Sequence, residues 1–242
     1  MRVLNEMMPD ETRVAKGRYH YLVDGEPSGQ VETWQITRLP DGSEVVRADL
    51  DGRTAEPRAN LVSHLKRTPE GRPQWLRIRF GHKGITAAAH YTFEPAEVRV
   101  FRQVEGHPRR QDVLDVPSAY EVDYHAVIAH DYVWRGYPDH ARGRRWAVPV
   151  FSPELWPQAA DDALMGRSLR FMIEPTGAQV CETPVRLFEV AQGYGITLSD
   201  GTKAQAWYDT HGIPLRWTYP DKAYEFIIVG YKRYDGIKEE KR

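Results

Sequence analysis

The sequence predicts a mainly β protein of the α+β class. We expect a strongly curved antiparallel sheet, an open half-barrel of two meanders, wrapped around one substantial helix. Three observations support this expectation. Apolar and polar residues alternate with period two through much of the chain, which is typical of strands with one buried face. Turn signals containing Gly recur at about 8–12-residue intervals, and one central stretch changes to helical spacing.

The first meander is expected over residues 16–103. Its pattern is clear in Gln74–Phe80, where Leu76, Ile78 and Phe80 alternate with arginines. The Pro40-Asp41-Gly42 run is a strong turn signal between two strands. Seven strands are predicted, over residues 17–23, 30–38, 44–50, 60–67, 74–80, 85–93 and 96–103.

The middle of the chain predicts a loop and then a helix. Residues 104–117 are polar and rich in Arg and Pro, which favours a loop. The next segment predicts a helix over 118–134, with Ser118 as its N-cap and Glu121 completing a capping box. Gly136, Tyr137 and Pro138 are expected to end it. The apolar positions that follow helical spacing are Tyr120, Tyr124, Val127, Ile128 and Tyr132.

The second meander is expected over residues 168–234, and its first two strands are expected over 169–174 and 178–182. Its clearest strand contains Leu215, Trp217 and Tyr219, which alternate with Arg216 and Thr218. The alternation assigns the first three to the concave side of the sheet. We expect one domain over residues 1–242, because short strands and a single helix bury little surface on their own.

Composition limits the classes of partner. The 242 residues include 33 Lys and Arg and 34 Asp and Glu, for a formal net charge of −1. This balance argues against a nucleic-acid or anionic-membrane footprint. The single cysteine, Cys181, cannot form an internal disulfide. The chain shows neither a signal peptide nor a membrane span, so we expect a cytoplasmic protein.

The densest group of chemically capable side chains lies in the predicted helix and just after it. On a helix, His125 and His130 would be about 140° apart, so they would not share a face. Asp123 and His130 would share one, and His140 could fold back towards them. A His/His/Asp metal site is one hypothesis, and the hydrophilic face of an ordinary helix is the other. The sequence contains no nucleophile motif and no Gly-rich phosphate cradle. We therefore assign no catalytic residue, metal ligand or cofactor.

Three stretches resemble bacterial half-barrel families similar to the lipoprotein-carrier (Lol-type) and glycolipid-binding superfamily. They are GRYHYLVDGEPSGQVETWQITR, DYHAVIAHDYVWRGY and the C-terminal run from ETPVRLFEV to FIIVGY. The most specific elements are G-x-Y-x-Y-x-V-x-G-x-x-x-G, from Gly17 to Gly29, and W-x-D-x-x-G-x-P-L-R, from Trp207 to Arg216. The resemblance implies a curved sheet around a helix, an open apolar cavity and no catalytic motif. Such proteins commonly carry an export signal, and because none is recognised in this sequence we do not expect a periplasmic carrier role.

Three functional hypotheses follow. The first is a non-catalytic binding protein that holds a lipid-like or other apolar ligand on the concave face. The second is a metal- or His-dependent enzyme with a site at the cavity mouth. The third is a scaffold whose barrel is filled by Tyr120, Tyr124, Val127 and Ile128. Exposed edge strands are compatible with a homodimer, although nothing in the sequence selects it. For the first hypothesis, the expected ligand-binding residues are Trp34, Ile36, Leu76, Ile78, Phe80, Leu215 and Trp217.

Overall fold

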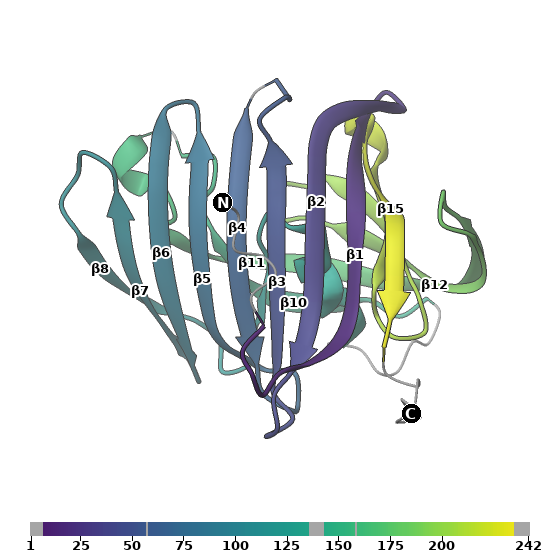
Figure 1. The fold of residues 1–242 in the computed structure, drawn as a ribbon, viewed down its shortest axis with the longest axis horizontal. Coiled ribbons are helices and arrows are strands. Elements are labelled where there is room, and N and C mark those ends of the chain that lie inside the picture. The colour runs from purple at the N-terminus through teal and green to yellow at the C-terminus, as the bar shows by residue number, and fades with distance from the viewer. Residues whose placement is uncertain (1–6, 57, 136–142, 158, 235–242) are drawn as a thin grey trace.

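A single curved sheet of 15 strands forms the frame of the described chain. The structure is a computed structural model and describes residues 7–56, 58–135, 143–157 and 159–234. Strands account for 63% of it, and their order is β8-β7-β6-β5-β4-β3-β2-β1-β15-β14-β13-β12-β11-β10-β9. Figure 1 shows β1 to β8 and β15 as one wall, with β10 to β12 behind it and short helices between. The mainly β prediction is confirmed, and the sheet is large, curved and unclosed.

The first seven strands form the predicted meander. They pair in sequence order, each antiparallel to the next. Their bounds are β1 (Thr12–Val23), β2 (Glu26–Arg38), β3 (Glu44–Gly52), β4 (Ala59–Arg67), β5 (Pro73–His82), β6 (Ile85–Glu94) and β7 (Glu97–Val104).

The second meander joins the first at the centre of the sheet. The last strand pairs antiparallel with β1, so strands from the two ends of the described chain lie side by side. This set comprises β10 (Trp146–Pro153), β11 (Gly166–Glu182), β12 (Leu187–Thr197), β13 (Lys203–Tyr208), β14 (Pro214–Tyr219) and β15 (Tyr224–Arg233). Two separate strands were predicted over 169–174 and 178–182. They are one strand, β11, because an irregularity between Pro175 and Gly177 shifts the register without ending the pairing.

The two edge strands of the sheet follow one another in the chain. One is β8 (Arg110–Asp115) and the other is β9 (Glu121–Val122), which pairs parallel with β10. The prediction of a loop over 104–117 is therefore wrong for its second half. The strand β8 is held by backbone pairing to β7 and exposes several side chains. Because neither of its faces is fully buried, its sequence lacks a clear apolar alternation.

The predicted helix over 118–134 is wrong for most of its length. The segment contains the strand β9, the 3₁₀ turn η1 (Val127–Asp131) and the four-residue helix α1 (Tyr132–Arg135). Ala126 has extended dihedral angles and interrupts any helix from 118. The segment packs its backbone against the sheet, and the contacts with distant strands override the helical periodicity. The proposed stop at Gly136, Tyr137 and Pro138 lies outside the described residues.

The core lies on the concave face, between the sheet and residues 122–135. Val122, Tyr124, Val127 and Ile128 are all buried there, whereas Tyr120 is half-buried. The predicted alternation in β14 is confirmed, because Leu215 and Trp217 are buried and their neighbours Arg216 and Thr218 are partly exposed. Residues 122–135, which we call the inner segment, therefore fill a large part of the concave face.

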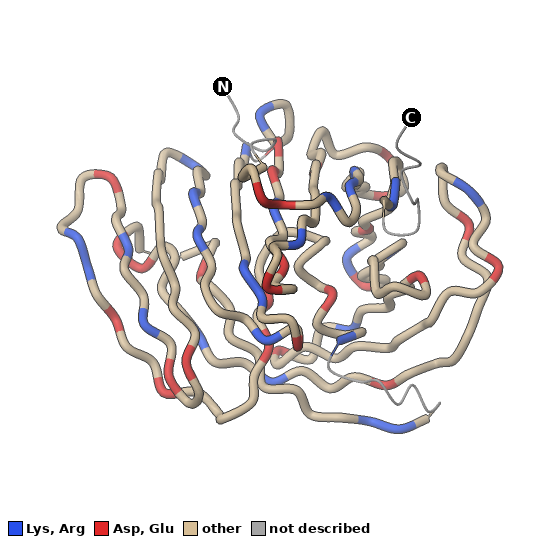
Figure 2. The backbone as a smooth tube through the Cα atoms, turned by 60° about the horizontal axis from the view of Figure 1, so that its bottom comes forward, with Lys and Arg blue, Asp and Glu red and all other residues tan. Residues whose placement is uncertain are grey.

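Charged residues of both signs are interspersed over the sheet. Figure 2 shows Lys and Arg segments mixed with Asp and Glu segments along the backbone. Among the described helices, none has the length and apolar character that crossing a membrane requires.

Candidate functional site

The seven residues predicted to bind a ligand lie in the core. They come from β2, β5 and β14 and are at most 4% exposed. Two of them touch residues of a pocket: the Phe80 ring is 5.4 Å from that of Trp156, and the Trp217 ring is 4.5 Å from that of His130. Their direct contact with a ligand stays a prediction. The full set is Trp34, Ile36, Leu76, Ile78, Phe80, Leu215 and Trp217.

A pocket of about 290 Å3 lies beside these core residues. It is bounded by the inner segment on one side and by the second meander with the loop after β10 on the other. Side chains from five separated parts of the chain meet here. The lining residues used below are Asp123, His125, His130, Glu154, Leu155, Trp156, Arg167, Leu169, Phe171, Leu198, Asp200, Tyr219 and Phe226.

The apolar part of the pocket is aromatic and aliphatic. Phe171 and Leu169 project from β11, and Phe226 projects from β15. The Tyr219 ring packs edge-on against Phe226 at 6.0 Å. Trp156 is 45% exposed at the pocket and packs edge-on against the His125 ring at 5.3 Å. These rings present flat apolar surfaces to a molecule bound in the pocket.

The polar part of the pocket centres on Asp123 and His130. Asp123 Oδ1 lies 3.2 Å from His130 Nε2, although the two atoms are not aligned as a hydrogen bond. Burial raises the pKa of the Asp123 carboxyl to about 7. Burial also lowers the pKa of the His130 imidazole to about 3, so His130 is neutral at physiological pH. The Asp123 side chain remains 20% exposed, so the pocket reaches it.

His125 contributes a second neutral imidazole. Burial lowers the pKa of its ring to about 4. Its Nε2 atom is buried and has no hydrogen-bond partner in the described structure. In neutral imidazole one ring nitrogen donates and the other accepts, and the tautomer decides which. The pocket therefore holds an imidazole with unused hydrogen-bonding capacity.

The other charged residues of the pocket have oppositely charged neighbours. Glu154 and Arg167 form an ion pair at 2.9 Å. The backbone N–H of Thr202 donates to Asp200 and, with a smaller effect from the Lys222 charge, lowers the pKa of the Asp200 carboxyl. Among the residues described, Asp123 has no Arg or Lys within ion-pair distance, and its partner is the neutral His130.

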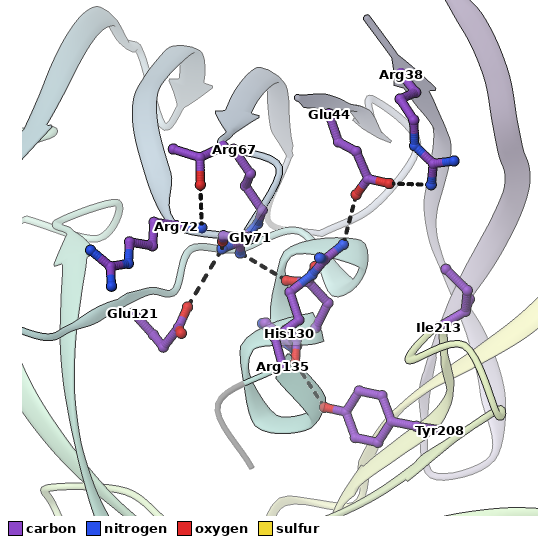
Figure 3. A network of polar contacts seen from close by, with 12 residues as sticks. Arg38, Glu44, Arg67, Gly71, Arg72, Glu121, His130, Arg135, Tyr208 and Ile213 are labelled. Atoms are coloured by element: carbon purple, nitrogen blue, oxygen red, sulfur yellow. Dashed lines mark hydrogen bonds and ion pairs between the residues drawn. The ribbon is translucent and has the colours of Figure 1, made fainter. Parts of the chain in front are cut away.

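An ion-pair network fixes the segment that carries His130 (Figure 3). Arg67 is fully buried and donates to Asp131 Oδ1 at 2.8 Å, and its other amino group lies 3.5 Å from Glu121. Arg135 donates to the second oxygen of Asp131 at 2.5 Å. The Tyr208 hydroxyl donates to the carbonyl of His130 at 2.8 Å. These contacts fix the backbone at His130 and at the next residue, Asp131, and so fix the position of the His130 imidazole.

Sequence reasoning found part of this site. It paired Asp123 with His130, and the structure brings them together, although on an extended stretch and a 3₁₀ turn. It separated His125 from His130 by helix geometry, and this was wrong because both line one pocket. His140 lies outside the described residues. Among the residues that the structure describes, no group of three His, Cys, Asp or Glu is arranged to hold a metal ion.

Two lining residues have different sequence signals. Tyr219 was assigned to the concave side by alternation with Leu215 and Trp217, and it does line the pocket. Trp156 follows β10 in an irregular loop, and no periodic pattern distinguishes it from the six other tryptophans.

Comparisons with known proteins concern the fold alone. No family model matches the chain, and no curated protein matches its sequence. A solved structure of a DUF1089 family protein from Pseudomonas aeruginosa is similar, with a TM-score of 0.50, 15% identity, and coverage of 81% of this chain and 92% of that one. A "putative lipoprotein" from Parabacteroides distasonis aligns with a TM-score of 0.31 and 10% identity over 91% of this chain and 96% of that one. A link to the Lol-type carriers is not confirmed, and the first likeness shows a shared fold.

Proposed function

We propose that this chain is a non-catalytic binding protein that holds a small, lipid-like or otherwise apolar-bodied molecule in the pocket between the inner segment and the second meander. One observation carries the proposal: a pocket of about 290 Å3 has aromatic and aliphatic walls and a few inward polar groups. This combination is typical of small-molecule sites, whose volumes are roughly 300–1,000 Å3. The volume favours one aromatic ring or a short alkyl chain over a whole diacyl lipid.

The filled concave face supports this smaller ligand. Because Tyr124, Val127 and Ile128 are buried against the sheet, the large apolar cavity expected of a lipid carrier is largely occupied by the chain itself. The space that remains lies where Trp156 and Tyr219 face the inner segment. We therefore propose that the ligand lies in this pocket and not along the whole concave face.

Calorimetric titration with benzyl alcohol and with 1-hexanol tests the proposal. We expect saturable binding to the wild-type protein and loss of binding in Leu169→Trp, because the larger ring fills the pocket. The matched control is Val113→Trp, since Val113 is 56% exposed on the edge strand β8 and does not line the pocket. Equal binding by both variants, or no binding of either probe to the wild type, would contradict the proposal.

A second candidate function is acid–base catalysis. The observation that favours it is the 3.2 Å approach of Asp123 to His130, with a carboxyl pKa of about 7. A carboxyl with that pKa can exchange a proton near neutral pH. Mass spectrometry of a bound molecule before and after incubation with the protein separates the two functions, because a binding protein returns its ligand unchanged.

A further inference from the structure

Among the described residues that line the pocket, Asp123 is the buried carboxylate that no Arg or Lys approaches within ion-pair distance. Glu154 pairs with Arg167 at 2.9 Å, and the Lys222 charge acts on Asp200. Asp123, by contrast, faces the neutral His130, and its pKa is raised by burial alone. When Asp123 is ionised, a negative charge lies in a poorly solvated place, and a cation brought by a ligand would stabilise it.

The surroundings of this carboxylate suit an organic cation. Burial and then the Asp123 charge raise the pKa of the Tyr219 hydroxyl, which places that phenol within electrostatic reach of the carboxylate. Trp156, Phe171 and Phe226 supply further aromatic surface around the same pocket. The electron-rich faces of aromatic rings attract ammonium groups, most strongly where water is excluded. Lys222 already shows this preference at Tyr219, with its ammonium 5.9 Å from the ring centroid.

An imidazole nitrogen close to Asp123 can form a hydrogen bond with the same ligand. His125 Nε2 is buried without a hydrogen-bond partner, and a neutral imidazole nitrogen can accept a hydrogen bond from an N–H group. Neither histidine adds positive charge at physiological pH, because burial lowers the pKa of His125 to about 4 and that of His130 to about 3. Asp131, beyond His130, is compensated by Arg67 and Arg135. The uncompensated charge of the pocket is therefore negative.

We infer that the ligand of this pocket carries a positively charged amine, held by the Asp123 carboxylate and by the faces of the surrounding aromatic rings. The inference rests on the proposed function, since it names the chemical class of ligand for the same pocket. The amine occupies the side next to Asp123, and the apolar body lies against Phe171 and Phe226. An anionic ligand is disfavoured at this position by the same carboxylate.

Three probes that share one ring and differ in charge test the inference. Benzylamine, benzyl alcohol and benzoate are titrated calorimetrically into the full chain at pH 8, where Asp123 is ionised. We expect benzylamine to bind at least about tenfold more tightly than benzyl alcohol, with benzoate weakest. The Asp123→Asn variant should lose the preference for the amine and keep its affinity for the alcohol. The control Asp115→Asn, which removes an exposed carboxylate from β8, should keep the preference.

A measurement on the unmodified protein guards against a variant that fails to fold. Benzylamine affinity should fall as the pH is lowered from 8 to 6, because Asp123 is protonated over this range, whereas the affinity for benzyl alcohol should stay constant. If the alcohol binds as tightly as the amine at every pH, the inference is overturned and the proposed function stands. If no probe binds, the proposed function itself fails, and the inference fails with it.

Discussion

Glu32 on β2 accepts a hydrogen bond at 2.6 Å from the backbone N–H of Val127, which lies 95 residues later in the chain. The same carboxylate accepts from the N–H of Ile128 at 3.1 Å and from the Tyr21 hydroxyl at 2.7 Å. The N–H groups at the start of a helical turn have no partner within the turn. The fully buried carboxylate of Glu32 therefore accepts the hydrogen bonds of the first N–H groups of η1, and it fixes the segment that leads to His130.

Replacing Glu32 should loosen this attachment. In Glu32→Ala, the Tyr21 hydroxyl and two buried N–H groups lose their acceptor, so we expect the free energy of unfolding to fall by on the order of 3 kcal/mol. Glu32→Gln keeps one acceptor oxygen and should cost less. Urea denaturation followed by circular dichroism measures both changes. Equal losses in the two variants would show that packing, and not hydrogen bonding, accounts for the effect.

Arg67 and Asp131 should be energetically coupled. Arg67 is fully buried and donates to Asp131 at 2.8 Å and to the carbonyl of Gly71 at 3.0 Å. We expect Arg67→Met to destabilise the fold by about 3 kcal/mol, because it leaves a buried carboxylate with less compensation. The double variant with Asp131→Asn should be less destabilised than the sum of the single variants, by about 1 kcal/mol or more.

The control for this prediction is an exposed ion pair. Arg38 lies 2.9 Å from Glu44, and 45% of its side chain is exposed. Arg38→Ala should change the stability by less than about 1 kcal/mol. Denaturant midpoints of all four variants give the comparison, and strictly additive effects of Arg67 and Asp131 would rule out coupling within the pair.

Gly17 should tolerate no side chain. A Cβ atom at this position would lie 2.4 Å from Cζ2 of Trp34 and 2.5 Å from the carbonyl oxygen of Gly230. Both neighbours are fixed, one as a fully buried indole and the other as backbone of the paired strand β15. We therefore expect Gly17→Ala to lower the free energy of unfolding by about 3 kcal/mol.

Gly81→Ala is the matched control, because its Cβ would meet nothing closer than the Ile85 carbonyl oxygen at 3.9 Å. Its stability should lie within about 0.5 kcal/mol of the wild type. Thermal unfolding measures both variants. A Gly17→Ala protein as stable as Gly81→Ala would mean that Trp34 can move away from β1.

The strands could be predicted where one face of the sheet is buried and the other is exposed. In β5, Leu76, Ile78 and Phe80 alternate with exposed arginines, and the pattern follows directly from that difference. The two faces of the edge strand β8 do not differ in burial in this way, so the sequence pattern of its six residues predicts a loop. Residues 118–134 show the opposite problem. Their helical spacing is real, but their conformation is determined by partners such as Glu32 and Arg67, which are distant in sequence.

The candidate site was partly predictable for the same reason. Asp123 and His130 stand out because several titratable side chains occur among the apolar residues of one short stretch. Glu32 carries a similar signal, since it shares the buried face of β2 with Trp34 and Ile36. Trp156 could not be predicted to join them. The loop that carries it is placed by tertiary contacts, one of which is the hydrogen bond from the Tyr91 hydroxyl to the Leu164 carbonyl at 2.6 Å.

The last prediction concerns the pH dependence of stability at Asp123. Burial raises the pKa of this carboxyl from 3.8 to about 7 on folding, so the folded state binds the proton more tightly than the unfolded state. Stability due to this group is therefore greatest below pH 4 and is lost as the pH rises from about 4 to about 7. The buried histidines act in the opposite direction, because the pKa of His130 is lowered from 6.5 to about 3 and its stability contribution is lost as the pH falls.

Comparing Asp123→Asn with the wild type isolates the effect of the carboxyl, because the variant and the wild type contain the same histidines. The free energy of unfolding of the variant, relative to the wild type, should rise by about 4 kcal/mol between pH 4 and pH 8. Urea denaturation at intervals across this range measures the difference, and Asp115→Asn, at an exposed position of β8, should show none. A difference between Asp123→Asn and the wild type that stays constant with pH would show that folding leaves the Asp123 pKa unchanged. Asp123 would then carry no charge penalty for an amine to relieve.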